Sequence, residues 1–305
     1  MSQTYEGGVI GVIGAGQIGR SVAHAFAEHS PVVLVDKNEQ ALTESYTAIR
    51  RAHLGRLLRK ATTVSLGTVL GNIRRTTQTA ELRRARLLIE NITESPEDKL
   101  ELHRELAGVA APTAVIAANT SAVPLAYLAA AHPDRADRLL GLHFMMPVVE
   151  IRSLELIRAA GTSQHTVTAT RRLLDRHGLR AIEVNDAPGF VSNRLLMLLV
   201  NEAAALVREG VADAAGVDAV LHDCFGHRLG PLATADLIGL DTVVRSLQVL
   251  QRFADPAKFA PDPALLDLVG AGRLGRKSGS GFFDYSPHAD AGAPSTAPAQ
   301  GAPIR

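Results

Sequence analysis

The sequence has little of what several classes of protein require. Its 305 residues include a single cysteine, Cys224, no tryptophan, and only 4% aromatic residues. One cysteine cannot form an intramolecular disulfide and supplies too few thiolates for a cysteine-based metal centre, so we expect no metal. No apolar run approaches the ~18 residues of a membrane span, and the first residues lack a basic and apolar signal. These absences predict a cytoplasmic protein that does not enter a membrane.

The net charge is also small, only +1, which argues against general binding to nucleic acid. The charge is unevenly placed, however. Between Arg50 and Arg86, ten basic residues stand against Glu81 alone, a local charge of +9. This segment either binds an acidic partner or is a solvated helical face.

One stretch, residues 8–36, indicates a dinucleotide-binding unit. The β-forming run Val9–Ile13 leads directly into GAGQIG, and apolar residues then recur at helical spacing before a second apolar run, Val32–Val35. That run ends at Asp36, 22 residues beyond Gly14, close to the ~20-residue offset of an acidic ribose ligand. The pattern predicts a strand, a glycine turn, a helix and a second strand.

Each glycine of this turn has a physical reason. Gly14 permits the tight turn, Gly16 lets the backbone approach a pyrophosphate, and Gly19 lets the helix pack closely on the sheet. The helix N-terminus attracts phosphate, and Asp36 accepts hydrogen bonds from ribose while repelling a 2′-phosphate, which favours NAD over NADP. The cofactor-binding residues predicted in this unit are Gly14, Gly16, Gln17, Ile18, Gly19 and Asp36.

The rest of the chain predicts an α/β fold followed by helices. We expect a Rossmann-type, doubly wound and mainly parallel sheet over residues 1–186, with a helical hairpin insertion after Asp36. An all-α domain is expected over 187–285, and a disordered tail over 286–305, which is rich in Ala, Pro and Gly. Three expected elements are a helix at Leu66–Arg74, a strand at Val148–Ile157 and a helix at Leu232–Phe253.

Polar residues follow the expected strands at their carboxyl ends, where doubly wound sheets bind ligands. They are Glu90, the trio Asn119–Ser121, and His143. Glu155 lies within an apolar stretch, where an ionised carboxylate needs a partner, and His143 is the natural one. Histidine as a residue type titrates near neutral pH, so such a pair beside a nicotinamide ring suits alcohol oxidation, in which a base accepts the hydroxyl proton.

The sequence resembles the short-chain L-3-hydroxyacyl-CoA dehydrogenase family, which includes the 3-hydroxybutyryl-CoA dehydrogenases. The resemblance runs from Val9 to Tyr285. It is carried by VIGAGQIG, by IENITE followed by Lys99, by ANTS and GLHFMMPV, by DAPGFVSNRLL, by GP with DLIGLD, and by GRLGRKSGSGFFDY. It implies NAD as cofactor, an acyl thioester substrate and a homodimer.

The resemblance also implies roles for individual residues. His143 is the implied general base, Glu155 orients it, and Ser121 and Asn193 match positions that hydrogen-bond the reacting oxygen. Glu90, Glu94 and Lys99 match the segment beside the nicotinamide ribose and the substrate, and Glu90, Lys99 and Asn119 are expected to bind the cofactor. In the basic hairpin, the residues implied to hold the nucleotide of coenzyme A are Arg50, Arg51, Arg56, Arg59 and Lys60.

Three departures from the family pattern concern the substrate. Met146 stands where the family has asparagine, Ala122 where it has a second serine, and Asn91 where a small apolar residue is usual. They leave open an alternative in which the hydroxyacyl group arrives on an acyl carrier protein, as in the synthesis of polyketide extender units. A dehydrogenase of free hydroxy acids and a non-catalytic NAD-binding scaffold or sensor are further alternatives.

Overall fold

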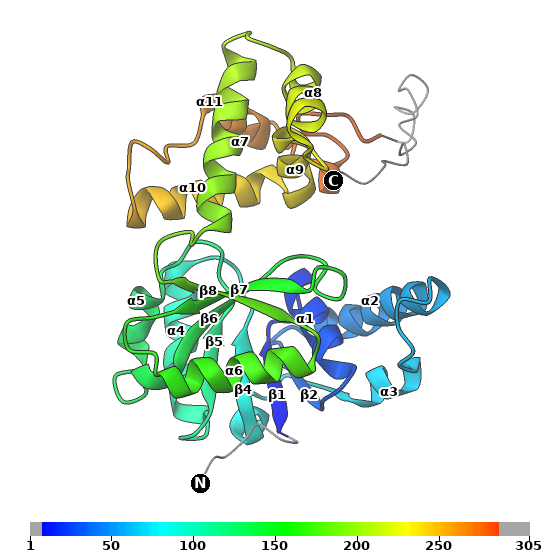
Figure 1. Ribbon diagram of the computed structural model, residues 1–305, viewed down its shortest axis with the longest axis vertical. Coiled ribbons are helices and arrows are strands. Elements are labelled where there is room, and N and C mark those ends of the chain that lie inside the picture. Colours follow the sequence, from blue (N-terminus) through cyan, green and yellow to red (C-terminus); the bar gives the residue numbers. More distant parts are fainter. Residues whose placement is uncertain (1–7, 287–305) are drawn as a thin grey trace, which may run out of the picture. The chain divides into compact units, whose positions relative to one another are not determined.

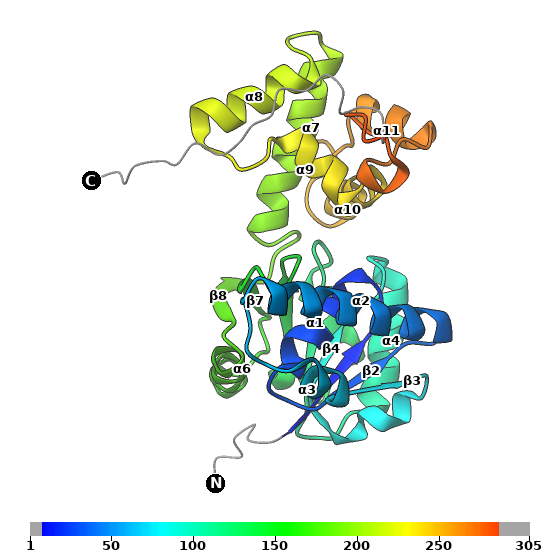
Figure 2. The same cartoon turned by 90° about the vertical axis from the view of Figure 1, so that its right-hand side faces the viewer.

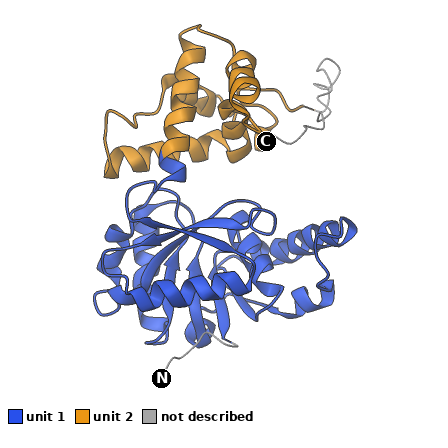
Figure 3. Cartoon of the chain, in the orientation of Figure 1, with its two compact units in different colours: residues 1–194 blue, residues 195–305 orange. Residues whose placement is uncertain are grey.

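The computed structural model describes residues 8–286. The chain divides into two compact units, residues 1–194 and 195–305 (Figure 3). The sequence prediction placed the division at Asp186, and its disordered tail lies almost entirely outside the described residues.

Unit 1 is built on one eight-stranded sheet within the described residues, with strand order β3-β2-β1-β4-β5-β6-β7-β8. Every neighbouring pair is parallel except β6 and β7, so the last two strands run opposite to the other six. The strands are β1 (Val9–Ile13), β2 (Val32–Val35), β3 (Ile73–Thr76), β4 (Ala85–Glu90), β5 (Val115–Ala118), β6 (Leu139–Phe144), β7 (Ser153–Arg158) and β8 (Arg180–Asn185).

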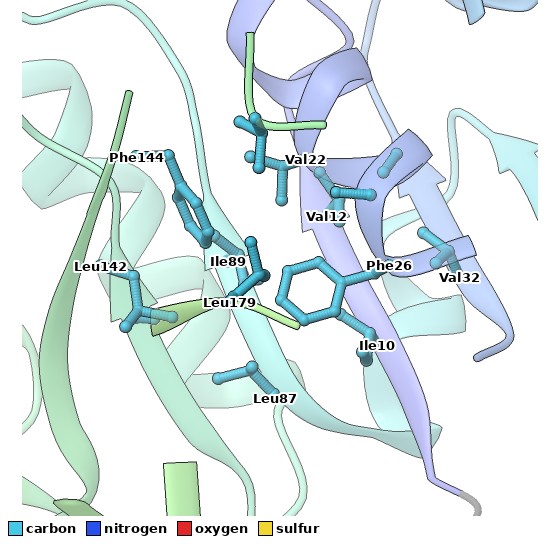
Figure 4. Packing of buried hydrophobic residues seen from close by; sticks show 14 of the residues in the cluster. Ile10, Val12, Val22, Phe26, Val32, Leu87, Ile89, Leu142, Phe144 and Leu179 are labelled. Atoms are coloured by element: carbon cyan, nitrogen blue, oxygen red, sulfur yellow. The ribbon is translucent and has the colours of Figure 1, made fainter. Parts of the chain in front are cut away.

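Helices cover both faces of this sheet, which explains why its central strands are mostly apolar. The helices of unit 1 are α1 (Gln17–Ala27), α2 (Glu39–Leu58), α3 (Leu66–Gly71), α4 (Pro96–Val109), α5 (Leu125–Leu128) and α6 (Gln164–Arg176). One core joins the sheet to α1 and α6 through side chains such as Phe26, Leu87 and Phe144 (Figure 4). A second core, around Leu88 and Leu106, joins the other face to α4. Figures 1 and 2 show α6 and α4 on opposite sides of the sheet.

Two predicted elements of unit 1 were partly wrong. The helix predicted at Leu66–Arg74 ends at Gly71, and Ile73 begins β3, pairing with Val32 in parallel register. The strand predicted at Val148–Ile157 begins only at Ser153, because the backbone first turns, with Glu150 N and Ile151 N donating to the Pro147 carbonyl. In both places, a local apolar pattern was continued across a turn.

Unit 2 is helical over its described residues, in agreement with the prediction. It contains most of α7 (Ser192–Arg208), and α8 (Ala214–Phe225), α9 (Pro231–Ile238), α10 (Leu240–Phe253) and α11 (Pro263–Gly270). The single helix predicted at Leu232–Phe253 is broken at Gly239, whose φ of 101° no right-handed helix accommodates. Within residues 8–286, none of the helices has the length and apolar character needed to cross a bilayer.

Candidate active site

The glycine turn after β1 has the form of a phosphate-binding site. Gly14 has φ 93°, and a Cβ on Gly19 would lie 1.8 Å from the Gly14 carbonyl oxygen, so the turn requires glycine at both positions. Gly16 is exposed and precedes α1, and a Cβ at this position would meet no atom within 4 Å. No side chain caps the first N–H groups of α1 at Gly16, so these donors are available to a phosphate.

Asp36 ties this turn to the end of β2. Its Oδ2 accepts a hydrogen bond from Ala15 N at 2.7 Å, and its Oδ1 accepts one from Asn38 N at 2.9 Å. The side chain is only partly buried, and a carboxylate has further lone pairs to offer. The residues present therefore fit the ribose and pyrophosphate of a dinucleotide.

His143 and Glu155 meet as predicted. They are directly opposite each other in the antiparallel pair of β6 and β7, so their side chains leave the same face of the sheet. His143 Nδ1 lies 2.8 Å from Glu155 Oε2, and both side chains are more than 90% buried. When the carboxylate accepts a hydrogen bond from Nδ1–H, the neutral tautomer of the ring presents the lone pair of Nε2 to the site.

Ser121 lies on the other side of the imidazole. Its Oγ is 3.1 Å from His143 Nε2, the nitrogen left free by the contact with Glu155. The loop that carries Ser121 is held by Glu94, whose Oε1 accepts hydrogen bonds from the backbone N–H groups of Ser121 and Ala122 at 2.9 and 2.7 Å. Glu94 thus acts on the site through the backbone of this loop.

The Glu155 carboxylate also contacts the segment that enters α7. Oε1 accepts hydrogen bonds from Val191 N and Ser192 N, both at 3.0 Å, and Oε2 accepts one from Ser192 Oγ at 2.6 Å. Burial alone raises the pKa of Glu155, but the hydrogen bonds from His143 and Ser192 outweigh it and lower the pKa to about 2. Glu155 is therefore a carboxylate at every working pH.

Asn193 follows Ser192 in α7, and Phe190 lies just before this helix. The Asn193 side chain is 8% exposed, and its Nδ2 has no hydrogen-bond partner within the described residues. A buried donor without a partner is costly, and this one has the chemistry to bind a substrate oxygen. Phe190, with a left-handed φ of 50°, packs near the imidazole, with ring centroids 6.0 Å apart.

Glu90 and Lys99, which the resemblance places beside the cofactor, pair with each other in the structure. Both side chains are completely buried and form an ion pair of 2.8 Å. Burial opposes both charges, yet their mutual attraction lowers the pKa of Glu90 and raises that of Lys99. Neither side chain has accessible surface in this structure, and the expected contact of both residues with the cofactor stays a prediction. Lys99 Nζ also donates to the Asn119 carbonyl at 3.2 Å and supports the loop after β5.

Two asparagines connect the end of β1 to the end of β6. Asn91 N donates to the Ile13 carbonyl at 2.7 Å, and Asn119 Nδ2 donates to Asn91 Oδ1 at 2.7 Å. Asn119 Oδ1 then accepts from Phe144 N at 3.3 Å, next to His143. The unusual Asn91 is thus part of a hydrogen-bonded chain across the carboxyl ends of β1, β4, β5 and β6, which share one edge of the sheet.

Among the predicted carrier-binding residues, Arg56 differs from the others. It is 4% exposed, donates to the Val149 carbonyl, and lies 3.4 Å from Glu28, so it is not available to a ligand on the surface of α2. The helical periodicity of α2 turns this arginine inward. The exposed members of the set are Arg50, Arg51, Arg59 and Lys60.

One group in residues 8–286 has the spacing of metal ligands. Ligand atoms of His24, Glu28 and His53 lie within 4.8 Å of one another, and all three side chains are buried. Two guanidinium groups already face this carboxylate, however, Arg56 at 3.4 Å and Arg152 at 3.2 Å. A divalent cation would have to share one carboxylate with the buried Arg56 and the partly exposed Arg152, which disfavours a metal here.

A glycine turn that fits a dinucleotide, and a histidine–carboxylate pair at the same edge of the sheet, define a class of protein: an NAD-dependent dehydrogenase acting on a CH–OH group. Models of two consecutive family domains match the chain. Residues 9–187 match the NAD-binding domain of 3-hydroxyacyl-CoA dehydrogenase, and residues 189–285 match its C-terminal domain. The chain therefore belongs to the 3-hydroxyacyl-CoA dehydrogenase family.

Individual relatives agree with this assignment. A probable 3-hydroxybutyryl-CoA dehydrogenase of Deinococcus radiodurans is 38% identical over 276 residues, which are 90% of this chain and 99% of the relative. The crystal structure of FadB2 of M. tuberculosis superimposes with a TM-score of 0.85 at 33% identity, over 91% of this chain and 98% of that one. The crystal structure of the (S)-3-hydroxybutyryl-CoA dehydrogenase PaaH1 of Ralstonia eutropha superimposes with a TM-score of 0.83 at 35% identity. The match covers 91% of this chain and 99% of that one.

The sequence reasoning missed Ser192, because a serine between two motif residues carries no chemical signal of its own. Only the position of β7 beside the start of α7 brings its hydroxyl to Glu155.

Proposed function

We propose that this protein oxidises 3-hydroxybutyryl-CoA and related short 3-hydroxyacyl-CoA thioesters, reversibly, with His143 as the general base. The observation that carries the proposal is the buried contact of 2.8 Å between His143 and Glu155, with Ser121 Oγ on the opposite nitrogen. The short acyl chain is suggested by the relatives described as 3-hydroxybutyryl-CoA dehydrogenases.

In the proposed mechanism, His143 Nε2 accepts the hydroxyl proton of the substrate. Bound NAD supplies the ring that accepts the hydride. Glu155 remains ionised, holds Nδ1–H and stabilises the imidazolium as it forms. In this proposal Ser121 Oγ, 3.1 Å from His143 Nε2, binds the reacting oxygen, and the unpartnered Nδ2 of Asn193 is a second candidate donor.

We propose that the exposed cations of α2 hold the nucleotide of coenzyme A. Arg59 is 62% exposed in its side chain and paired only at the surface, 2.8 Å from Glu150, so a phosphate can compete for it. Arg50 and Arg51 in the second half of α2, and Lys60 just after it, are also exposed. Cations at this density attract the phosphates of a nucleotide or the carboxylates of an acidic protein.

Three alternative functions are less well supported: a carrier-protein substrate, a non-catalytic scaffold and a free hydroxy acid substrate. The two relatives named as 3-hydroxybutyryl-CoA dehydrogenases act on a coenzyme A thioester, and they provide no support for a polyketide extender unit on a carrier protein. The retained His143–Glu155 pair argues against a non-catalytic scaffold. For a free hydroxy acid, the exposed cations of α2 would have no ligand to hold.

The experiment is to follow NADH absorbance with one 3-hydroxybutyryl group carried by coenzyme A, by pantetheine or by acyl carrier protein. We expect kcat/KM to be at least about tenfold higher with coenzyme A than with pantetheine, because each phosphate contact adds binding energy. Arg59→Glu should remove most of this preference without changing the rate on pantetheine.

Arg172→Glu, which alters an exposed arginine of α6, is the matched control and should keep the preference. Turnover of the carrier-protein substrate alone would replace the coenzyme A proposal. A lack of NADH with every thioester would reject the dehydrogenase function itself.

We also propose a homodimer formed through unit 2. This unit exposes large apolar side chains on and near α8 and α9, including Val211, Val220, Phe225 and Leu237, each more than 50% exposed. Apolar surface at this density is typical of an interface between subunits.

A further inference from the structure

Ser192 is the first residue of α7, and its hydroxyl contacts the histidine–carboxylate pair. Its Oγ donates to Glu155 Oε2 at 2.6 Å and lies 3.4 Å from His143 Nδ1. The same carboxylate oxygen receives the Nδ1–H of His143 at 2.8 Å. Two donors therefore share a single oxygen, one of them the imidazole and the other a hydroxyl.

The carboxylate has little freedom to escape this competition. Its other oxygen accepts hydrogen bonds from Val191 N and Ser192 N, both at 3.0 Å, at the start of a helix where N–H groups lack intrahelical partners. Four donors thus fix both oxygens of Glu155. Because the carboxylate cannot rotate, the serine hydroxyl and the imidazole both donate to Glu155 Oε2.

This competition has a chemical consequence for the base. A hydroxyl at 2.6 Å makes a short, charge-assisted hydrogen bond, which withdraws electron density from the carboxylate oxygen. The oxygen then supports a positive charge on the neighbouring imidazole less well. The carboxylate still orients the ring, but it does not hold the imidazolium as strongly as it would alone.

We propose that Ser192 is a positioning residue that moderates the His143–Glu155 pair, so that His143 gives up its proton at a lower pH than the pair alone would allow. The proposal rests on the role of His143 as general base, proposed above. A moderated pair keeps the base unprotonated, and therefore ready to accept the hydroxyl proton, over a wider range of pH.

Other charged groups lie farther from the His143–Glu155 pair. From the loop after β4, Glu94 reaches the Ser121 backbone rather than the imidazole and is itself paired with Lys99 at 3.6 Å. On β8, Arg180 lies opposite Ser153, and Glu183 is engaged by Arg171 at 2.7 Å. On α7, Arg194 follows Asn193. Because Glu94 and Glu183 are engaged by other partners, the serine hydroxyl is the adjustable donor in direct contact with the pair.

The test compares Ser192→Ala with Ser192→Thr, which keeps the hydroxyl. In the alanine variant, the acid limb of kcat/KM for alcohol oxidation should move to higher pH by about half a unit. Because kcat/KM falls tenfold per unit along that limb, this is roughly a threefold loss at acid pH. In the threonine variant, the acid limb of kcat/KM should lie at the same pH as in the unchanged protein, because the hydroxyl is still present.

Ser163→Ala is the matched control, because Ser163 is also a serine at a helix N-terminus, where it accepts a hydrogen bond from Thr166 N. Its loss should lower stability without moving the limb. The proposal is overturned if the acid limb of kcat/KM does not move in Ser192→Ala. It is also overturned if the limb moves by the same amount in Ser192→Thr.

A second measurement needs no turnover. The imidazole resonance that disappears in His143→Gln can be followed by NMR through a pH titration of the full chain with NAD. Its midpoint should lie about half a unit higher in Ser192→Ala, and an unchanged midpoint overturns the proposal. A shifted midpoint in a protein that oxidises no thioester would support the effect of Ser192 while rejecting the proposed function.

Discussion

At the scale of the residue, the proposed chemistry depends on one nitrogen. His143 Nδ1 is occupied by Glu155 at 2.8 Å, so only Nε2 is free to accept a proton, and Ser121 Oγ lies 3.1 Å from it. The cofactor turn is held by separate residues, chiefly Gly14, Gly19 and Asp36. Loss of the base and loss of the cofactor should therefore be separable.

Replacing His143 by glutamine should lower kcat by about 10²- to 10⁴-fold, since a positioned general base contributes on that order. The dissociation constant of NADH, measured by fluorescence titration, should change less than about threefold, because the glycine turn is untouched. His165→Gln is the control, since His165 is exposed on α6. A His143→Gln variant that retains more than a tenth of its kcat would remove this residue from the mechanism.

At the scale of the element, buried histidine pairs connect helices to their neighbours. His24 of α1 lies 2.9 Å from His53 of α2, and His103 of α4 lies 2.8 Å from His132. Since His53 Nε2 donates to the Val64 carbonyl at 2.9 Å, its Nδ1 is the acceptor for His24. In each pair, the ring nitrogen that accepts the hydrogen bond must carry no proton.

These pairs predict how stability depends on pH. Burial first, and then the neighbouring histidine, lower the pKa of His24 to about 4 and that of His132 to about 3. Because the unfolded chain binds these protons already near pH 6.5, the free energy of unfolding should fall as pH drops from 6.5 toward 4. His24 alone should lower the free energy of unfolding by on the order of 3 kcal/mol over this pH range.

Calorimetric unfolding between pH 4 and 7 checks this, with His132→Asn expected to show a shallower fall across the window. His165→Asn, at an exposed position, should follow the unchanged protein. A stability that is flat from pH 6.5 to 4 would show that these rings are not held neutral.

At the scale of the whole molecule, each unit has its own buried polar links. In unit 2, Asp236 is completely buried and accepts hydrogen bonds from Phe282 N and Phe283 N, both at 3.0 Å. It thereby joins the DLIGLD segment to the GFFDY segment, which lie far apart in the sequence. The large apolar surface that remains exposed on this unit is the basis of the proposed dimer.

Light scattering after size exclusion should give twice the chain mass of 32.3 kDa. Phe225→Asp should produce the monomer, because Phe225 is 71% exposed and a buried charge at an interface is costly. Leu58→Asp, at a leucine of α2 that is 84% exposed, is the matched control and should remain dimeric. A monomeric unchanged protein at micromolar concentration would reject the dimer.

The sequence by itself determined the features that depend on neighbouring residues in the chain. The glycine turn, Asp36 after β2 and the capping of α4 by Ser95 follow from local backbone geometry, which the residue types specify directly. The pairing of His143 with Glu155 was also predictable, because an apolar strand leaves a carboxylate in need of one partner.

Only the tertiary structure decided which polar side chains face a ligand and which support the fold. Arg59 and Arg56 are alike in sequence, yet one is exposed and the other is buried against Glu28. Lys99 turned inward to its buried partner, and Ser192 became a donor to Glu155. Burial and long-range hydrogen bonds depend on how distant elements pack together, and no local pattern of residues encodes that arrangement.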